Sequence, residues 1–184
     1  KIKDTKTKFI FLSSRKVYQP APNIRENSKI KCANNYEKNK YITEKKIIKF
    51  HKKNSIILRI SNLIGFKKNN LRKIHSTYVD YLLRIIKKGR IIENEKQFKD
   101  FLDINNFSKI IHLIIKNKIF GTYNVSIGEK IYLNEINHWL LHYYKNKKQL
   151  KVIMKNDLKK NESFFLNNSK LLKKINLKLN KEKL

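Results

Sequence analysis

Short apolar runs alternate along the chain with longer segments whose apolar residues recur at helical intervals. The runs Lys8–Ser13 and Ser55–Ile64 are rich in aromatic and β-branched residues, which is the pattern of buried strands. Between them, Tyr36–His51 carries apolar residues at helical spacing, and Asn34 or Asn35 can cap its first turn. The first third of the chain therefore predicts a strand, a helix and a second strand.

The alternation continues to the end of the chain. The pattern predicts a helix over Ile74–Lys88, with Gly89 behind it as a C-cap, and a later helix that opens at Asn105 or Asn106. The remaining elements are strands over residues 90–93, 98–104 and 121–126 and helices over about 105–117, 133–145 and 167–175. Strands that alternate with helices favour an α/β fold with parallel strand pairing.

A large positive charge is the most unusual property of the composition. The 184 residues include 44 Lys and Arg against 14 Asp and Glu, which gives a formal net charge of +30. Such a charge attracts the phosphates of nucleic acids, membranes or nucleotides. Of the 44 basic residues, however, 38 are Lys and 6 are Arg, whereas proteins that read base edges favour Arg. Lys, Asn and Ile are all abundant, so we attribute the charge to codon bias in an A/T-rich genome and do not expect a nucleic-acid partner.

Several classes of protein are disfavoured by what the chain contains. Its hydrophobic fraction of 40% is too high for a disordered polyelectrolyte. The single cysteine, Cys32, excludes an internal disulfide, and His138 and His142 have no evident third metal ligand. No apolar run reaches the ~18–20 residues of a membrane span, and no signal peptide is visible. We therefore expect a cytoplasmic protein without a metal site or a membrane partner.

Three side chains are placed to move a proton together. Ser14 follows the first strand, and Tyr36 and Lys40 share a face of the predicted helix because they are four residues apart. A free phenol has a pKa of about 10 and is a poor base at neutral pH, but a nearby ammonium favours its phenolate form. A hydroxyl at the carboxyl end of a parallel strand lies where open α/β sheets bind ligands. This arrangement suits proton transfer between a carbinol and a carbonyl.

The sequence around these residues resembles the extended short-chain dehydrogenase/reductase family of NAD(P)-dependent sugar-nucleotide epimerases, dehydratases and reductases. FIFLSSRKVY resembles the family's strand ending in Ser-Ser-x-x-Val-Tyr, in which Ser14 falls on the active-site Ser or Thr. YEKNKYITE matches Tyr-x-x-x-Lys-x-x-x-Glu, and ILRISNLIG resembles the Leu-Arg-x-x-Asn-x-x-Gly strand. KDFLDINNF, GTYNVSIGE and FFLNNSKLLKKINL resemble later segments of the family in the same order. The resemblance covers nearly the whole chain.

The resemblance implies a role for each matching residue. Tyr36 would be the catalytic acid/base, and Lys40 would hold the nicotinamide ribose of NAD or NADP and tune Tyr36. The backbone around Ser61 would pass near the nicotinamide. The residues expected to contact a nucleotide-sugar substrate are Ser14, which would bind the reacting oxygen, Asn62 and Lys99.

The fold that the resemblance implies is α/β, a partial Rossmann-like parallel sheet with a small C-terminal α/β substrate lobe. Residues 1–65 would be the C-terminal part of the NAD(P)-binding Rossmann domain and carry the Ser, Tyr and Lys. Residues 66–184 would mainly form the substrate lobe, with about 98–128 returning to the Rossmann sheet. The family's Gly-x-x-Gly-x-x-Gly loop does not occur in the sequence. We therefore expect a fragment that lacks the N-terminal Rossmann half and binds the cofactor poorly by itself.

Further departures from the family pattern narrow the expected reaction. Arg15 and Lys16 stand where sugar 4,6-dehydratases place Asp-Glu, which disfavours elimination of water. Lys99 replaces the usual Arg, so a point charge replaces a bidentate fork, and Asn106 replaces the usual Asp. The expected function is that of a sugar-nucleotide epimerase or 4-keto-reductase. The sequence does not decide whether the protein is a monomer or a homodimer. The alternative is a non-catalytic basic module that binds nucleic acid or phosphate on the same fold.

Overall fold

The computed structural model describes residues 7–51, 53–65, 78–93, 96–144, 151–154 and 163–181. The first elements are β1 (Phe9–Ser14), the 3-10 turn η1 (Arg15–Val17), α1 (Asn35–His51), β2 (Ser55–Ile60), β3 (Asn62–Ile64), α2 (Tyr78–Lys87), β4 (Arg90–Glu93) and β5 (Phe98–Lys99). They are followed by β6 (Phe101–Asp103), α3 (Ile104–Lys116), β7 (Gly121–Val125), β8 (Ile131–Tyr132), α4 (Leu133–Tyr144), β9 (Lys151–Met154) and α5 (Ser169–Ile175). The fold is α/β, as the alternating sequence pattern predicts.

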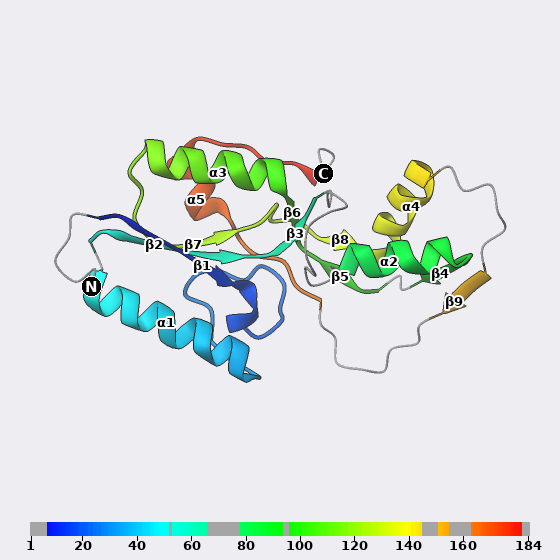
Figure 1. Ribbon diagram of the computed structural model, residues 1–184, viewed down its shortest axis with the longest axis horizontal. Helices are drawn as coiled ribbons and strands as arrows, with labels where there is room; N and C mark the ends of the chain where they lie inside the picture. Colours follow the sequence, from blue (N-terminus) through cyan, green and yellow to red (C-terminus); the bar gives the residue numbers. More distant parts are fainter. Residues whose placement is uncertain are drawn as a thin grey trace.

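The centre of the fold is a parallel sheet of three strands in the order β1-β2-β7 (Figure 1). Ser14 of β1 lies opposite Ile60 of β2, and Ile60 lies opposite Val125 of β7. Because the three strands run in the same direction, their carboxyl ends meet at one edge of the sheet. Open α/β sheets bind ligands at this edge, so Ser14 stands where a ligand site is expected.

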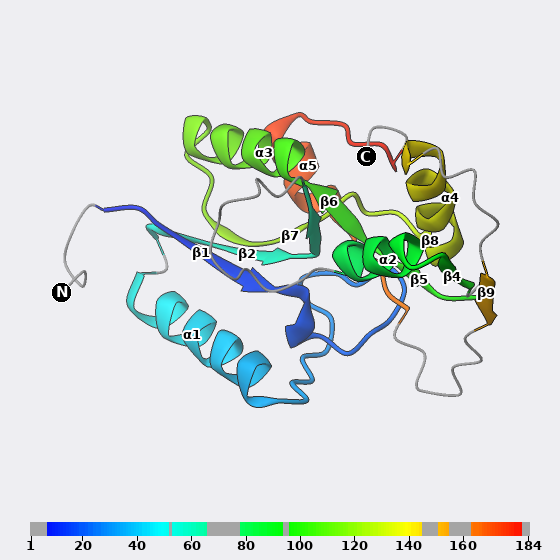
Figure 2. The ribbon, with the colours of Figure 1, turned by 45° about the vertical axis from the view of Figure 1, so that its right-hand side comes forward.

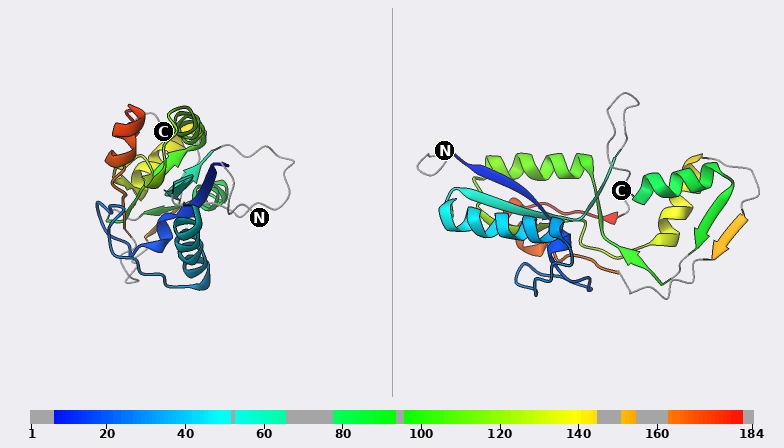
Figure 3. Two further views of the ribbon diagram at one scale, coloured as in Figure 1. Left: turned by 90° about the vertical axis from the view of Figure 1, so that its left-hand side faces the viewer. Right: turned by 60° about the horizontal axis from the view of Figure 1, so that its bottom comes forward.

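Helices cover both faces of the central sheet and produce three layers (Figure 1, Figure 3). α1 lies on one face, and α3 and α5 lie on the other. Along β2, the side chains of Ile56, Leu58 and Ile60 join the apolar core that includes residues of α3 and α5. The intervening Arg59 contacts α1 instead, because successive side chains of a strand point to opposite faces. β2 is buried along its whole length and nevertheless presents one charged side chain to α1.

A second part of the chain lies beside the central sheet and contains α2, α4, β4 and β9 (Figure 2). β4 and β9 pair in parallel, and the short strands β5 and β8 pair antiparallel. This part has its own buried apolar cluster, made of Leu82, Phe101, Ile131, Leu133 and Ile136. None of the helices in the described part of the chain is both long enough and apolar enough to cross a membrane.

Two strands are interrupted where the sequence pattern predicts continuous ones. The predicted strand Ser55–Ile64 divides at Ser61 into β2 and β3, because β3 leaves the central sheet and pairs with β6. The predicted strand over residues 98–104 divides at Asp100 into β5 and β6, and its last residue belongs to α3. Hydrophobic periodicity reports burial and cannot show that a strand changes its partner. The strands β8 and β9 are not predicted at all.

Helix boundaries follow the capping residues. The side chain of Asn34 accepts a hydrogen bond from the backbone N–H of Glu37 at 3.1 Å, so Asn34 caps α1 as predicted. α3 begins earlier than predicted because Asp103 caps it, accepting from the backbone N–H of Asn106 at 2.9 Å. Gly89 follows α2 with a φ of 71°, a conformation that favours glycine. Residues 74–77 and 145, predicted as helical, lie outside the described residues.

Candidate active site

Ser14 lies at the carboxyl end of β1, where the strand gives way to η1. Its Oγ accepts a hydrogen bond from the backbone N–H of Lys16 at 3.2 Å, which fixes the first turn of η1. The preceding residue, Ser13, is buried and donates a hydrogen bond from its hydroxyl to Glu44 of α1. The segment around Ser14 is therefore tied both to its own turn and to the neighbouring helix.

α1 brings Tyr36 and Lys40 to the same end of β1. Lys40 Nζ donates to the carbonyl oxygen of Leu12 at 2.8 Å, two residues before Ser14. The same nitrogen lies 5.1 Å from the ring centroid of Phe11 and 5.8 Å from that of Tyr36, both within cation–π range. Tyr36 is 53% exposed, so a ligand can reach its ring. The ammonium that the sequence singles out is thus held between the strand end and the tyrosine.

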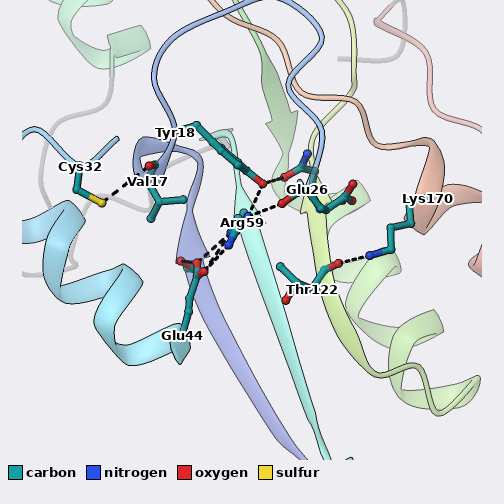
Figure 4. Close-up of polar contacts among 10 residues, drawn as sticks. Val17, Tyr18, Glu26, Cys32, Glu44, Arg59, Thr122 and Lys170 are labelled. Atoms are coloured by element: carbon teal, nitrogen blue, oxygen red, sulfur yellow. Dashed lines mark hydrogen bonds and ion pairs between the residues drawn. The ribbon is translucent and has the colours of Figure 1, made fainter. Parts of the chain in front are cut away.

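A buried polar network joins α1 to the sheet next to this strand end (Figure 4). Arg59 of β2 donates to the carboxylate of Glu44 from Nε and Nη2, with 2.6 Å between Nη2 and Oε2. Arg59 Nη1 also donates to the hydroxyl oxygen of Tyr18 at 2.6 Å. Tyr18 in turn donates to Asn124 Oδ1 of β7 at 3.0 Å. Glu44 and Arg59 are only 1% and 6% exposed, so the network connects four segments inside the protein.

Two members of this network, Tyr18 and Arg59, keep fixed protonation states near neutral pH. Burial raises the pKa of Tyr18 to about 12, so its hydroxyl remains a donor at neutral pH. Burial lowers the pKa of Arg59, but the hydrogen bonds and electrostatic interactions with Glu44 and Tyr18 together outweigh this effect, so the pKa is raised overall. The contact between Arg59 and Tyr18 therefore does not change its protonation near neutral pH.

Comparison with protein families identifies this combination of strand, helix and second strand. The model of the NAD dependent epimerase/dehydratase family matches residues 1–126, about two thirds of the chain, and this segment contains β1, α1, β2 and β7. The chain belongs to this family. No curated protein matches the chain.

Solved structures share the fold of this epimerase/dehydratase family member. The UDP-N-acetylglucosamine 4-epimerase from Methanobrevibacter ruminantium M1, solved with UDP-N-acetylmuramic acid, matches with a TM-score of 0.80 and 21% identity over 99% of this chain and 61% of that one. RMD from Pseudomonas aeruginosa, complexed with NADPH, matches with a TM-score of 0.75 and 17% identity over 94% of this chain and 61% of that one. UDP-glucuronic acid 4-epimerase from Bacillus cereus, in complex with NAD, matches with a TM-score of 0.73 and 17% identity over 94% of this chain and 56% of that one. The chain spans about three fifths of the length of these proteins.

Asp100 of the family member is fully buried and joins segments that are distant in sequence. Its carboxylate accepts backbone hydrogen bonds from Leu166 at 2.9 Å and from Gly128 at 3.3 Å. Its backbone carbonyl accepts hydrogen bonds from Ser61 Oγ at 2.6 Å and from Asn62 Nδ2 at 3.0 Å. Asp100 therefore fixes the segment at the carboxyl end of β2, where two of the predicted ligand residues lie.

Lys99 is also expected to contact a ligand, together with Ser61 and Asn62. It is the last residue of β5 and precedes Asp100 in the sequence. Its Nζ is 5.1 Å from the ring centroid of Tyr78 of α2. The structure thus brings Ser61 and Asn62 to the carbonyl of Asp100, the residue after Lys99, while Ser14, Tyr36 and Lys40 lie at the end of β1. Because β1 and β2 are neighbours and end at the same edge of the sheet, Ser14 and Ser61 lie on adjacent strand ends.

Replacing Asp100 by Asn should make stability less dependent on pH. Burial raises the pKa of Asp100 to about 7, against the opposing effect of the backbone hydrogen bond from Leu166. The folded protein then binds this proton more tightly than the unfolded chain does, so the free energy of unfolding falls as pH rises from about 4 to about 7. One proton gives a slope of at most about 1.4 kcal/mol per pH unit. Urea denaturation of both proteins at pH 5 and pH 7 measures the difference, and parallel pH profiles would contradict the assignment.

Sequence reasoning gave no role to three residues that the structure shows to be central: Tyr18, Asp100 and Asn124. Each lies within a segment that resembles the family, in RKVY, KDF and TYN respectively. Hydrophobic periodicity cannot show that a polar residue is buried, because it counts an Asp or an Asn as a polar position whether that residue lies in a loop or in the core. The only signal in the sequence was their place inside these motifs.

Proposed function

We propose that this chain carries the proton-transfer site and the substrate lobe of an NAD- or NADP-dependent enzyme acting on a nucleotide sugar, either an epimerase or a 4-keto-reductase. The observation that carries the proposal is the position of the Lys40 ammonium, 2.8 Å from the Leu12 carbonyl at the end of β1 and 5.8 Å from the Tyr36 ring centroid. Membership of the epimerase/dehydratase family and the fold shared with epimerases that bind UDP-sugars support it.

In this proposal Tyr36 exchanges a proton with the oxygen on the reacting sugar carbon. The bound nicotinamide supplies the hydride acceptor or donor for that carbon. The positive charge of Lys40 stabilises the negative charge that develops on the phenol oxygen during transfer, and its remaining N–H groups can hold a ribose hydroxyl. The hydroxyl of Ser14 can donate to the sugar oxygen. Loss of the hydroxyl proton and of a hydride from carbon converts the carbinol to a ketone. Return of the hydride to the other face of that carbon, with a proton returning to the oxygen, inverts the configuration.

The residues that follow Ser14 favour this chemistry over elimination of water. Elimination needs an acid for the leaving hydroxyl and a base for the departing proton. The two positions after Ser14 are Arg15 and Lys16, which carry no carboxyl group. The Arg15 guanidinium carbon lies 3.7 Å from the ring centroid of Phe164, so the side chain is stacked on the apolar cluster beside η1. We therefore assign epimerisation or reduction, not dehydration.

We assign contact with the diphosphate of the substrate to Asn62 and Lys99. One N–H of the Asn62 amide is used by the Asp100 carbonyl, which leaves the other N–H of that amide as the donor for an anion. Lys99 would contribute a point charge in place of a bidentate guanidinium. Residues 1–65 would form the cofactor-side part and residues 66–184 mainly the substrate lobe, with about 98–128 returning to the central sheet, where β7 lies beside β2.

The residues present fit the nicotinamide end of the cofactor better than its pyrophosphate. Tyr36, Lys40 and the backbone around Ser61 lie at neighbouring strand ends, where a nicotinamide ribose could be held. The pyrophosphate needs a glycine-rich turn before a helix N-terminus, and none of the four glycines lies at the start of a helix that the structure describes. In the described part of the chain β1 pairs only with β2, and Leu12 on β1 is 44% exposed. An apolar strand with one unpaired edge is a template for a further strand, so we propose that turnover requires an additional dinucleotide-binding unit.

The 184-residue chain by itself should bind NAD with a dissociation constant weaker than about 1 mM. The reason is that the nicotinamide side alone gives few contacts, while the pyrophosphate is left without its usual N–H donors. Isothermal titration calorimetry with NAD and with NADH measures the affinity. Micromolar binding of either nucleotide to the isolated chain would show that these residues hold the complete cofactor site.

A further inference from the structure

The ion pair between Glu44 and Arg59 joins α1 to the central sheet, and no step of the proposed chemistry uses it. The proposed proton path runs through Tyr36, and Glu44 lies two helical turns further along the same helix. Both charges are withdrawn from solvent, at 1% and 7% side-chain exposure. A buried ion pair adds little to stability compared with well-packed apolar residues, because desolvation of both charges offsets their attraction. Its location therefore calls for a role other than stability.

The pair holds the Ser14 segment from both sides. Glu44 accepts the hydroxyl of Ser13, the residue immediately before Ser14. Arg59 donates to the hydroxyl of Tyr18, four residues after Ser14, at 2.6 Å. A side chain on each side of Ser14 is thus bonded to a different member of the same ion pair. A shift of either charge would move the strand end relative to the helix.

The pair also sets the position of α1. Tyr36, Lys40 and Glu44 follow one another at intervals of four residues and so share one face of the helix. Glu44 is anchored by three hydrogen bonds from Arg59, at 3.1, 3.1 and 2.6 Å. Bonds to two nitrogens of a planar guanidinium restrict rotation as well as distance. A helix fixed in this way at Glu44 has its rotation about its own axis fixed one turn earlier, at Lys40.

We propose that the Glu44–Arg59 pair is the positioning element that aligns Tyr36 and Lys40 with Ser14. The assignment of these three residues as the reacting set rests on the proposed function, but the alignment itself is a property of the folded chain. Neither charge touches the reacting atoms, so both residues act through others. The contact between Lys40 Nζ and the Leu12 carbonyl, 2.8 Å, is the result of this alignment.

The test replaces both charges at once, by Glu44→Leu with Arg59→Met. Exchange of a buried ion pair for apolar residues of similar volume is often neutral for stability, so the double variant separates alignment from folding. The readout is the nuclear Overhauser effect between the Lys40 ε-methylene protons and the ring of Phe11 on β1, whose centroid lies 5.1 Å from Nζ. The effect between Lys40 and the ring of Tyr36, at 5.8 Å on the same helix, serves as an internal reference. We expect a fold like the parent's, with the Lys40–Phe11 effect reduced at least threefold and the Lys40–Tyr36 effect retained.

A second variant keeps the test decisive if the double variant does not fold. Ser13→Ala removes one hydroxyl and leaves the ion pair intact, and we expect it to weaken the Lys40–Phe11 effect at least twofold. The matched control is Glu135→Gln. It breaks the partly exposed ion pair between Glu135 and Lys181, whose charged atoms are 3.0 Å apart and which does not involve α1, so it should change neither Overhauser effect. An unchanged Lys40–Phe11 effect in Ser13→Ala, or in a folded double variant, would overturn the proposal.

These spectra are recorded on the 184-residue chain without cofactor or substrate, so their outcome does not depend on turnover. Failure of the proposed function would appear separately, as absence of reaction in a protein whose Lys40 contacts are intact. In a form that turns over, the double variant should lower kcat ~100-fold and leave KM within about threefold, because misplacement of catalytic groups by ~1 Å costs about this much.

Discussion

Replacing Glu44 by Ala should lower the free energy of unfolding by about 3–5 kcal/mol. The substitution leaves the Arg59 guanidinium, which is 7% exposed, without its carboxylate partner inside the protein. It also removes the acceptor of the Ser13 hydroxyl. An uncompensated buried charge has no water to replace its partner, so the loss greatly exceeds that of a single neutral hydrogen bond. Urea denaturation followed by circular dichroism gives the difference.

The matched control for this effect is Glu135→Ala. Glu135 pairs with Lys181 at 3.0 Å, but the two side chains are 29% and 36% exposed. Water can solvate either charge once the pair is broken, so the cost should stay below about 1 kcal/mol. Equal losses for the two variants would mean that the pair between α1 and β2 is as well solvated in solution as a surface pair.

Replacing Tyr36 by Phe should remove most of the turnover and little of the stability. The side chain is 53% exposed, so loss of its hydroxyl leaves no buried group without a partner. Loss of a positioned general acid/base typically lowers kcat by ~10²–10⁴-fold, while KM should change little because the phenol contributes mainly in the transition state. The assay follows UDP-N-acetylglucosamine and UDP-glucuronic acid by NMR in a fusion that places the dinucleotide-binding unit of the Methanobrevibacter epimerase before this chain.

The matched control for Tyr36→Phe is Tyr41→Phe. Tyr41 lies on the same helix and is partly buried against the apolar cluster beside η1. It has no part in the proposed proton transfer, so its variant should keep kcat within about twofold of the parent. If both phenylalanine variants reduced turnover equally, the effect would come from the packing of α1 and not from the Tyr36 hydroxyl.

The sequence allowed the parts of the fold that depend on local patterns to be predicted. The apolar run before Ser14 and the helical spacing after Asn34 predicted β1 and α1, and the caps at Asn34 and Gly89 lie where expected. The i,i+4 spacing of Tyr36 and Lys40 was enough to place them on one face of a helix. These features depend on neighbours along the chain, which a single sequence contains.

Features that depend on partners distant in sequence could not be predicted in this way. The break between β2 and β3 arises because Asn62–Ile64 pairs with residues 101–103 and leaves the central sheet. The contact between Arg59 and Tyr18 joins residues 41 positions apart, and that between Tyr18 and Asn124 spans 106 positions. No periodicity in the sequence reports such contacts. The polar network to which we assign the alignment of the candidate site is therefore visible only in the three-dimensional arrangement.

The most direct test of the proposed function is the absorbance at 340 nm after the fusion protein, loaded with NAD, is mixed with a UDP-sugar. Reduced nicotinamide absorbs at this wavelength, so hydride transfer from the sugar carbon produces a transient signal. The proposed roles predict a rise in absorbance in the parent and in Tyr41→Phe, and a rise at least ~100-fold slower in Tyr36→Phe. A rise of the same rate in Tyr36→Phe, or none in a parent that binds both ligands, would contradict the assignment of Ser14, Tyr36 and Lys40 as the reacting set.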